Sequence, residues 1–465
     1  MNRYKKLFSN TVILGLGTFG SKLLVFLLMP LYTSWLSTSQ YSTAELITST
    51  ANLLIPLACV GISNGIFRFA AERESDQKTV FSTSIALLAF GLGGFCILSP
   101  LLGLIDYFDG YTWLIVAYVF FANVQAVCAQ YVRAIDRTRL FAVQGILNTG
   151  LTILFNILFL AVWDMGVTGY VLSVVAGNIL TAAYLVFAAK LWRVFAFSAV
   201  SKRMMKDLLR FSLPLIPTTV CWLITDLSDR YMVTYFCGSD INGIYSAAYK
   251  IPTIVNLISG IFMQAWQFSA VAESSDGETC KKFYSEVFRG FLSVIFIGSA
   301  GLILLSRFLA GLLLNTAYFD AWRYMPTLLC AAALESIVSF LATVYMVRKK
   351  SMHSFLTAMV GTVLNIVLNL LLIPSCGALG ASIATMAAYA AVLTVRMIDV
   401  PRIIPFKLCL PRLGVNVVLL LSAAAVMTFE PVGRIWWTLA ITVAVVAINA
   451  PTLLVSFKRL IQRRK

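Results

Sequence analysis

Long apolar runs separated by short polar connections alternate along the whole chain. Fourteen runs approach or exceed the roughly 20 residues that a helix needs to cross the hydrocarbon core of a bilayer. They occupy approximately 10–33, 43–67, 80–105, 112–132, 140–163, 167–191, 208–236, 242–268, 287–314, 322–347, 353–374, 378–398, 411–429 and 434–457. Backbone groups within lipid must bond inside their own segment, which favours helices. The pattern therefore predicts an all-α polytopic membrane protein.

Composition and charge support this prediction. The 465 residues are 60% hydrophobic and only 12% charged, whereas soluble domains carry about 25% charged residues. The net charge of +16 would suit a nucleic-acid partner, but thirty of the 36 lysines and arginines fall in alternate connections and the two ends. Basic connections stay on the cytoplasmic side of a membrane. We therefore expect both termini to be cytoplasmic and no nucleic acid to bind.

Several kinds of chemistry find no support in the sequence. No connection is long enough for a folded domain, and no GxxxxGK[ST] phosphate-binding loop is present. The nine cysteines show no CxxC spacing, so we expect neither a metal site nor a disulfide framework. The single histidine, His353, follows a basic cluster at a helix start and is interpreted as solvated. The first apolar run continues past Leu31 without a small-residue cleavage site, which indicates a retained helix.

An internal repeat divides the chain. Two stretches share an asparagine followed by two glycines, namely Asn156, Gly166 and Gly169 in the first and Asn369, Gly377 and Gly380 in the second. The copies lie 213 residues apart at the asparagine and 211 at the glycines. Repeats of this kind are typical of transporters built from two related lobes. We predict six-helix lobes at 1–207 and 208–400, followed at 401–465 by two additional helices and a basic cytoplasmic tail.

Charged residues interrupt the seventh and eighth runs, which flank a polar break at 237–242. Asp226, Asp229 and Arg230 lie in the seventh run and Lys250 lies in the eighth. Ionisable groups at membrane depth usually face a polar interior and mark functional sites. Asp226 precedes Arg230 by four residues, the order that favours an ion pair on one helical face. The four charges either lock the two helices together or engage an anionic substrate in one state of a transport cycle.

Lys22 is the best candidate for a cation that binds an anionic substrate. It lies sixteen residues after Lys6 and thirteen before Trp35, which places it roughly 20–24 Å from each boundary along a helix. We expect no acid of the same lobe at that depth, because Glu45 is predicted near the outer interface. The alternative is that Lys22 snorkels to the membrane surface or caps carbonyl groups.

Glu335 is a candidate for coupling to an ion gradient. It lies midway between Asp320 outside and Arg348 inside. A carboxylate at that depth can carry a proton or Na⁺, and the alternative is a hydrogen bond to a neighbouring helix. Four asparagines are expected to join helices through such bonds: Asn148, Asn156, Asn365 and Asn369.

Three stretches resemble bacterial polysaccharide flippases of the O-antigen and capsule type. The first is ILGLGTFGSKLLVFLLMPLYTSWLSTSQYSTAELI, which resembles their first two helices. The second combines DLSDRY at Asp226 with NGIYSAAYKIP at Asn242, and the third is GALGASIAT at Gly377. Ser42 departs from the glycine that this family commonly shows after the tyrosine, without altering the expected fold. The superfamily also contains multidrug antiporters and the lipid II flippase.

The resemblance implies a function in surface polysaccharide biosynthesis. It implies alternating-access transport of undecaprenyl-diphosphate-linked oligosaccharide to the outer leaflet of the bacterial inner membrane. It also implies contact with membrane lipids and with a polysaccharide polymerase and a phosphoglycosyl transferase. No cofactor is expected beyond an H⁺ or Na⁺ gradient. An ion-coupled multidrug or cation antiporter is the alternative, although Lys22, Arg230 and Lys250 favour an anionic cargo. An enzyme is not expected, because no large outer connection with catalytic acids is present.

Overall fold

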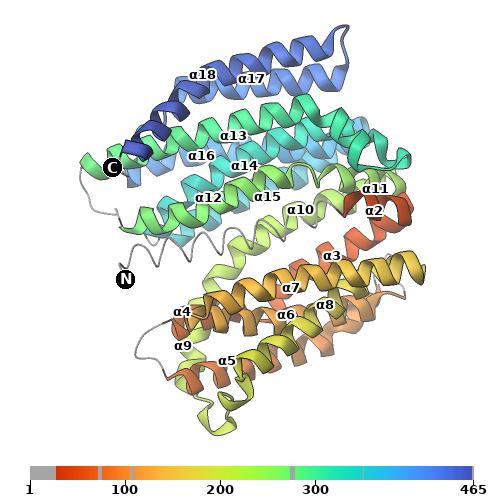
Figure 1. Ribbon diagram of the computed structural model, residues 1–465, viewed down its shortest axis with the longest axis vertical. Coiled ribbons are helices and arrows are strands. Elements are labelled where there is room, and N and C mark those ends of the chain that lie inside the picture. Colours follow the sequence, from red (N-terminus) through yellow and green to blue (C-terminus); the bar gives the residue numbers. More distant parts are fainter. Residues whose placement is uncertain are drawn as a thin grey trace. The chain divides into compact units, whose positions relative to one another are not determined.

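The described part of the chain is helical. The computed structural model describes residues 28–71, 76–104, 108, 110–272, 278–348 and 350–462, and no strand occurs within these ranges. Its first half contains α2 (Met29–Trp35), α3 (Thr38–Ala58), α4 (Ile62–Ala70), α5 (Gln77–Leu98), α6 (Thr112–Ala134), α7 (Thr138–Asn156), α8 (Gly166–Ala189) and α9 (Lys202–Ser212) (Figure 1). Its second half contains α10 (Ile216–Cys237), α11 (Ser239–Ala248), α12 (Thr253–Ala272), α13 (Glu278–Leu313), α14 (Met325–Val347), α15 (Ser351–Cys376), α16 (Ala378–Ile403), α17 (Leu410–Phe429) and α18 (Arg434–Gln462). Short helical turns join some of them, such as η1 (Ser99–Leu104), η3 (Ile157–Val162) and η7 (Thr316–Arg323).

The predicted polytopic helical class is confirmed. Within the described residues, ten helices are long and apolar enough to cross a membrane, or up to twelve if each of two bent pairs forms one span. The predicted first span at 10–33 lies mostly outside those residues. The predicted eighth span at 242–268 is divided between α11 and α12. The total of fourteen spans stays a prediction.

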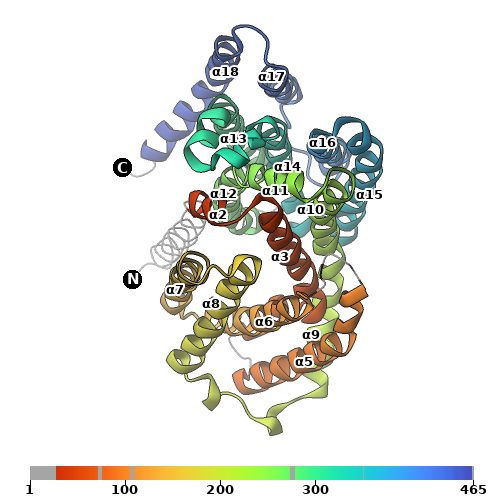
Figure 2. The same cartoon turned by 90° about the vertical axis from the view of Figure 1, so that its right-hand side faces the viewer.

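The chain forms two compact units that meet in sequence between Leu227 and Ser228. In the first unit, α6 and α8 pack together, α7 packs on α8, and α3 and α4 pack on α6 (Figure 2). In the second, α14 is the central span, with 83% of its most apolar window buried. There α16, α12 and α13 pack on α14, and the α17–α18 hairpin packs on α13 (Figure 1). The predicted boundaries after residues 207 and 400 stay predictions.

Glycines allow the last two helices of each predicted lobe to approach closely. A Cβ on Gly380 of α16 would lie 2.4 Å from the carbonyl oxygen of Leu372 on α15. A Cβ on Gly169 of α8 would lie 3.1 Å from the carbonyl oxygen of Phe159 in η3. Only glycine fits such contacts without a backbone shift. The repeated glycines therefore have the same packing role in both units.

The membrane-crossing path is bent between α3 and α4. The two helices meet at 51°, after Pro56 inside α3 and at two residues with positive φ, Val60 and Gly61. Proline removes a helical hydrogen bond, and a left-handed residue ends the helix. Beyond this bend, α4 packs against α9 of the same unit.

Candidate functional site

A buried carboxylate lies at the junction of four helices in the second unit. The side chain of Asp229 on α10 is completely buried. Its Oδ1 accepts hydrogen bonds from the amide nitrogens of Asn365 (3.0 Å) and Asn369 (2.7 Å). Its Oδ2 accepts from the hydroxyls of Tyr245 (3.2 Å) and Thr385 (2.5 Å). We call these five residues the Asp229 cluster. Four donors directed at one carboxylate are the arrangement expected for an ionised acid.

The helical sequence explains how these groups converge. Asn365 and Asn369 are four residues apart on α15 and therefore share a face. The Asn369 amide nitrogen also donates to Asn365 Oδ1 at 3.1 Å, which fixes the orientation of both amides. The hydroxyl of Ser228, next to Asp229 on α10, donates to the same oxygen at 2.9 Å. The prediction that Asn365 and Asn369 join helices is thus confirmed, but their acidic partner was not predicted.

Two of the predicted cations, Arg230 and Lys250, lie in or near a break between helices of the same unit. Helix α10 ends at Cys237 and α11 begins at Ser239, with Gly238 at positive φ between them. The chain leaves helical geometry again between Ala248 and Thr253, and Lys250 lies within this second break. Arg230 is buried, and its guanidinium carbon lies 5.1 Å above the ring of Tyr249. Broken helices and their exposed ends often form the binding sites of transporters.

The remaining predicted acids, Asp226 and Glu335, are both half-buried. Asp226 is half-buried one turn before Arg230 on α10. Glu335 on α14 is half-buried, and its Oε2 accepts a hydrogen bond from the Asn256 amide of α12 at 2.9 Å. Glu335 therefore forms the hydrogen bond to a neighbouring helix that we gave as its alternative role. A role of Glu335 in ion coupling stays a prediction. Lys22 lies outside the described residues.

A second buried carboxylate, in the first unit, was missed by the sequence reasoning. Glu45 on α3 is only 4% exposed, and its position near the outer interface stays a prediction. Its Oε1 accepts a hydrogen bond from the hydroxyl of Tyr170 on α8 at 3.0 Å. The ring of Tyr32 on α2 packs edge-on against that of Tyr170, with centroids 5.0 Å apart. An isolated glutamate within an apolar run was the available signal, because such a group needs polar neighbours.

Asn156 extends this arrangement. Its amide nitrogen donates to the Tyr32 hydroxyl at 3.0 Å, and its Oδ1 accepts from the Ser173 hydroxyl at 2.9 Å. We call Tyr32, Glu45, Asn156, Tyr170 and Ser173 the Glu45 cluster. The bond from Asn148 on α7 to Asn178 on α8 (3.0 Å) lies in the same unit. The predicted joining role of Asn148 and Asn156 is therefore confirmed.

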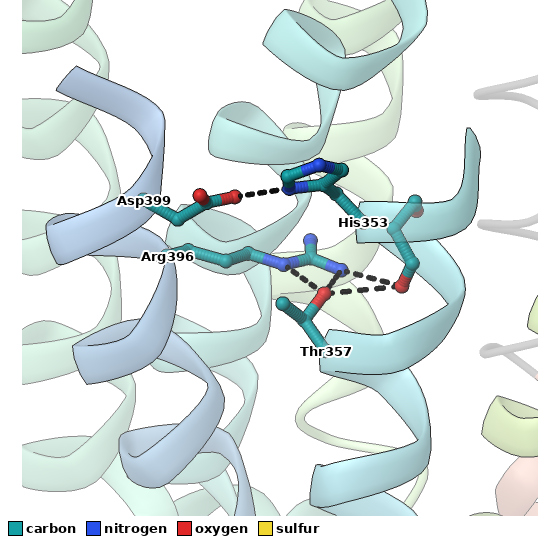
Figure 3. A network of polar contacts seen from close by, with 5 residues as sticks. His353, Thr357, Arg396 and Asp399 are labelled. Atoms are coloured by element: carbon teal, nitrogen blue, oxygen red, sulfur yellow. Dashed lines mark hydrogen bonds and ion pairs between the residues drawn. The ribbon is translucent and has the colours of Figure 1, made fainter. Parts of the chain in front are cut away.

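A separate polar network joins the N-terminal part of α15 to the C-terminal part of α16 (Figure 3). The buried guanidinium of Arg396 donates to Thr357 Oγ1 through Nε at 3.0 Å and to the Val338 carbonyl at 2.7 Å. His353 Nδ1 lies 2.8 Å from Asp399 Oδ2, and 42% of the histidine side chain is exposed. His353 is thus partly exposed to solvent, as expected, but its partner Asp399 was not predicted. The network fixes the two helices that supply Asn365, Asn369 and Thr385.

Comparison with known sequences identifies one family. A family model described as polysaccharide biosynthesis protein matches residues 7–267, more than half of the chain. No curated protein sequence matches it.

Comparison with solved structures identifies a common fold. The lipid II flippase MurJ in an inward closed conformation is 13% identical, with a TM-score of 0.71 over 97% of this chain and 100% of the other. An inward-facing multidrug resistance MATE transporter of the MOP superfamily is 15% identical, with a TM-score of 0.68 over 82% and 95%. A MOP superfamily transporter from Pyrococcus furiosus, described as having a binding pocket of reverse polarity, is 15% identical, with a TM-score of 0.62 over 85% and 96%. At these identities the likeness shows the fold alone.

Proposed function

We propose that this chain, which belongs to the polysaccharide biosynthesis protein family, is a flippase for undecaprenyl-diphosphate-linked oligosaccharide. It carries this cargo by alternating access from the cytoplasmic to the outer leaflet of the bacterial inner membrane, for surface polysaccharide such as O-antigen or capsule. Both termini are cytoplasmic. The work is transport and not catalysis. A phosphoglycosyl transferase supplies the cargo, and a polymerase consumes it.

The observation that carries this proposal is the pair of cations beside the broken α11–α12 helix. The cargo bears an anionic diphosphate, which must leave water to pass the middle of the bilayer. Fixed cations at low dielectric lower the cost of that passage. Lys250 lies in the break, where irregular backbone can line a binding site, and Arg230 on α10 is buried against the ring of Tyr249 at the edge of that break. Lys22, in the first lobe, is the third cation that binds the diphosphate.

The Asp229 cluster supplies the coupling to an ion gradient. Asp229 is adjacent to Arg230 on α10, and the hydroxyl of Tyr245, four residues before Tyr249 on α11, donates to it at 3.2 Å. A hard cation such as Na⁺ prefers oxygen ligands. Turning the amides of Asn365 and Asn369 would direct their carbonyl oxygens at a bound ion in place of their N–H groups. A proton would instead convert the carboxyl into a donor and displace one of the four hydrogen bonds. Asp226 and Glu335 are further sites for coupling.

The test is complementation of a strain from which the gene has been deleted. Undecaprenyl-linked saccharide in the membrane and surface polysaccharide are quantified together. We expect the deletion to accumulate the lipid-linked saccharide and wild type to clear it. Lys22→Ala, Arg230→Gln and Lys250→Gln are each expected to leave it accumulated at normal protein levels. Arg323→Gln removes an exposed cation that is paired with Asp320, and should clear it like wild type.

Two outcomes would overturn the proposal. The first is that no lipid-linked saccharide accumulates in the deletion strain and efflux of a cationic dye falls instead, which would make the protein an ion-coupled antiporter. The second is that all three cation variants export normally, which would leave the diphosphate without its proposed contacts.

A further inference from the structure

The helix α9 presents four cations on one face. At 100° per residue, Lys202, Arg203, Lys206 and Arg210 fall within one sector of about 100°, and all four are exposed. Asp207, the one acid of α9, lies about 40° beyond that sector. The opposite face carries Leu208, which is fully buried. A short helix divided in this way is typical of a segment that lies in the plane of a membrane surface.

The loop that precedes α9 in the chain exposes aromatic side chains. Trp192 is 49% exposed and Phe197 is 85% exposed. Trp192 packs against Phe187 at the end of α8, and Phe197 packs against Phe195. Tryptophan and phenylalanine next to basic residues are the combination that enters the headgroup region of a bilayer.

The surrounding helices hold this surface in place. The backbone N–H groups of Ala196 and Ser201 donate to the buried hydroxyls of Ser82 (3.0 Å) and Thr83 (3.1 Å) on α5. A Cβ on Gly65 of α4 would lie 2.6 Å from the hydroxyl of Ser212, so the absence of a side chain there admits α9 closely. The cations and aromatics are therefore displayed from a formed platform.

We propose that α9 and the loop at 190–201 form a docking surface for anionic phospholipids of the cytoplasmic leaflet. The arrangement of basic residues along the chain predicts that this end faces the cytoplasm. The complementarity is between four clustered cations and negatively charged headgroups, with the aromatic side chains entering the acyl boundary. Because α9 bends into α10 at 48°, bound lipid anchors the segment from which the next membrane helix departs.

The test uses the full-length protein in nanodiscs that contain 20% phosphatidylglycerol and 80% phosphatidylcholine. Either lipid is brominated in turn to quench nearby tryptophans, and subtraction of Trp192→Phe isolates the Trp192 signal. Phosphatidylglycerol should quench Trp192 about threefold more than its share of the bilayer predicts. The combined variant Lys202→Gln, Arg203→Gln, Lys206→Gln and Arg210→Gln should remove this enrichment.

Two control variants test whether the enrichment depends on positive charge at these four positions and not on altered folding or on cations elsewhere. Exchanging lysine and arginine at the same four positions (K202R, R203K, K206R, R210K) should keep the enrichment. Removing four other exposed cations, at Lys282, Arg289, Arg402 and Lys407, should also keep it. The proposal is overturned if wild type shows no enrichment, if the second control loses it, or if excess soluble isoprenyl diphosphate abolishes it. This measurement does not involve transport, so its result is independent of the proposed cargo.

Discussion

The two units each bury a carboxylate, but they surround it differently. Asp229 lies on α10 and accepts four hydrogen bonds from α11, α15 and α16. Glu45 lies on α3 and accepts a hydrogen bond from Tyr170 on α8. The asparagines that the sequence repeat aligns behave differently as well. Asn369 donates to the Asp229 carboxylate, whereas Asn156 donates to the neutral Tyr32 hydroxyl.

The comparison shows which features the repeat preserves. Both units keep the glycine that permits close helix packing and the buried asparagine on the helix before it. The buried acid lies on α3 in the first unit and on α10 in the second. Hydrogen bonds to a charged group are roughly twice as strong as neutral ones, so Asn369, which donates to a carboxylate, is expected to contribute more to stability than Asn156, which donates to a hydroxyl. The Asp229 cluster also lies beside the cations proposed to bind cargo, and we therefore assign the ion coupling to this unit.

The largest effect is expected from neutralising the two acids. Asp229→Asn places an amide N–H₂ among four donors and removes the charge, so the free energy of unfolding should fall by about 3 kcal/mol. Glu45→Gln keeps an acceptor for Tyr170 and should cost about 1 kcal/mol. Reversible unfolding in mixed micelles measures both. Equal losses would show that the two clusters are energetically alike.

The next effect concerns the repeated glycines. Gly380→Ala forces a methyl group against a backbone carbonyl at 2.4 Å and should cost about 2 kcal/mol. In Gly169→Ala the tightest contact is Met165 Cβ at 2.9 Å and the Phe159 carbonyl oxygen lies at 3.1 Å, both longer than the contact at Gly380, so the cost should be about 1 kcal/mol. The same unfolding assay compares them, and a larger loss for Gly169→Ala would contradict the packing described.

A smaller difference is expected between the repeated asparagines. Asn369→Leu removes a hydrogen bond to a buried carboxylate and should cost about 1.5 kcal/mol. Asn156→Leu removes bonds to neutral hydroxyls, and bonds between membrane helices average about 0.6 kcal/mol. Each variant can be compared with leucine at the exposed Asn64 as a control. If Asn156→Leu proved the more damaging change, the ranking of the clusters would be wrong.

The smallest effect is expected from the Tyr245 hydroxyl. Tyr245→Phe removes one of four donors to Asp229 and leaves the ring contacts with Tyr249 and Tyr324. The loss in unfolding free energy should be about 0.5–1 kcal/mol. Transport should persist with a changed dependence on the H⁺ or Na⁺ gradient, measured in proteoliposomes. An unchanged ion dependence would place the coupling elsewhere, with Glu335 the next residue to test.

The sequence predicted the helical class, the polytopic arrangement and the charged residues of α10 and of the break at Lys250. Apolar length and lone charges are local properties, so they can be read directly from the chain. The four donors to Asp229 could not be predicted, because they come from residues 16 to 156 positions away. The burial of Glu45 was missed for the same reason, since its partner Tyr170 lies 125 residues further along. Pro252, two residues after Lys250, is the local signal for the break there.

The most direct test of the account is cargo movement in proteoliposomes. A fluorescent isoprenyl-diphosphate-linked saccharide is placed in the bilayer, and a membrane-impermeant quencher reports its transfer between leaflets. Wild type and Arg323→Gln are expected to transfer it under an ion gradient, and Lys250→Gln at a rate at least tenfold lower, about 1.4 kcal/mol in activation free energy. Asp229→Asn should lose the response to the gradient. Equal rates for wild type, Lys250→Gln and protein-free vesicles would contradict the proposed cationic site and its anionic lipid cargo.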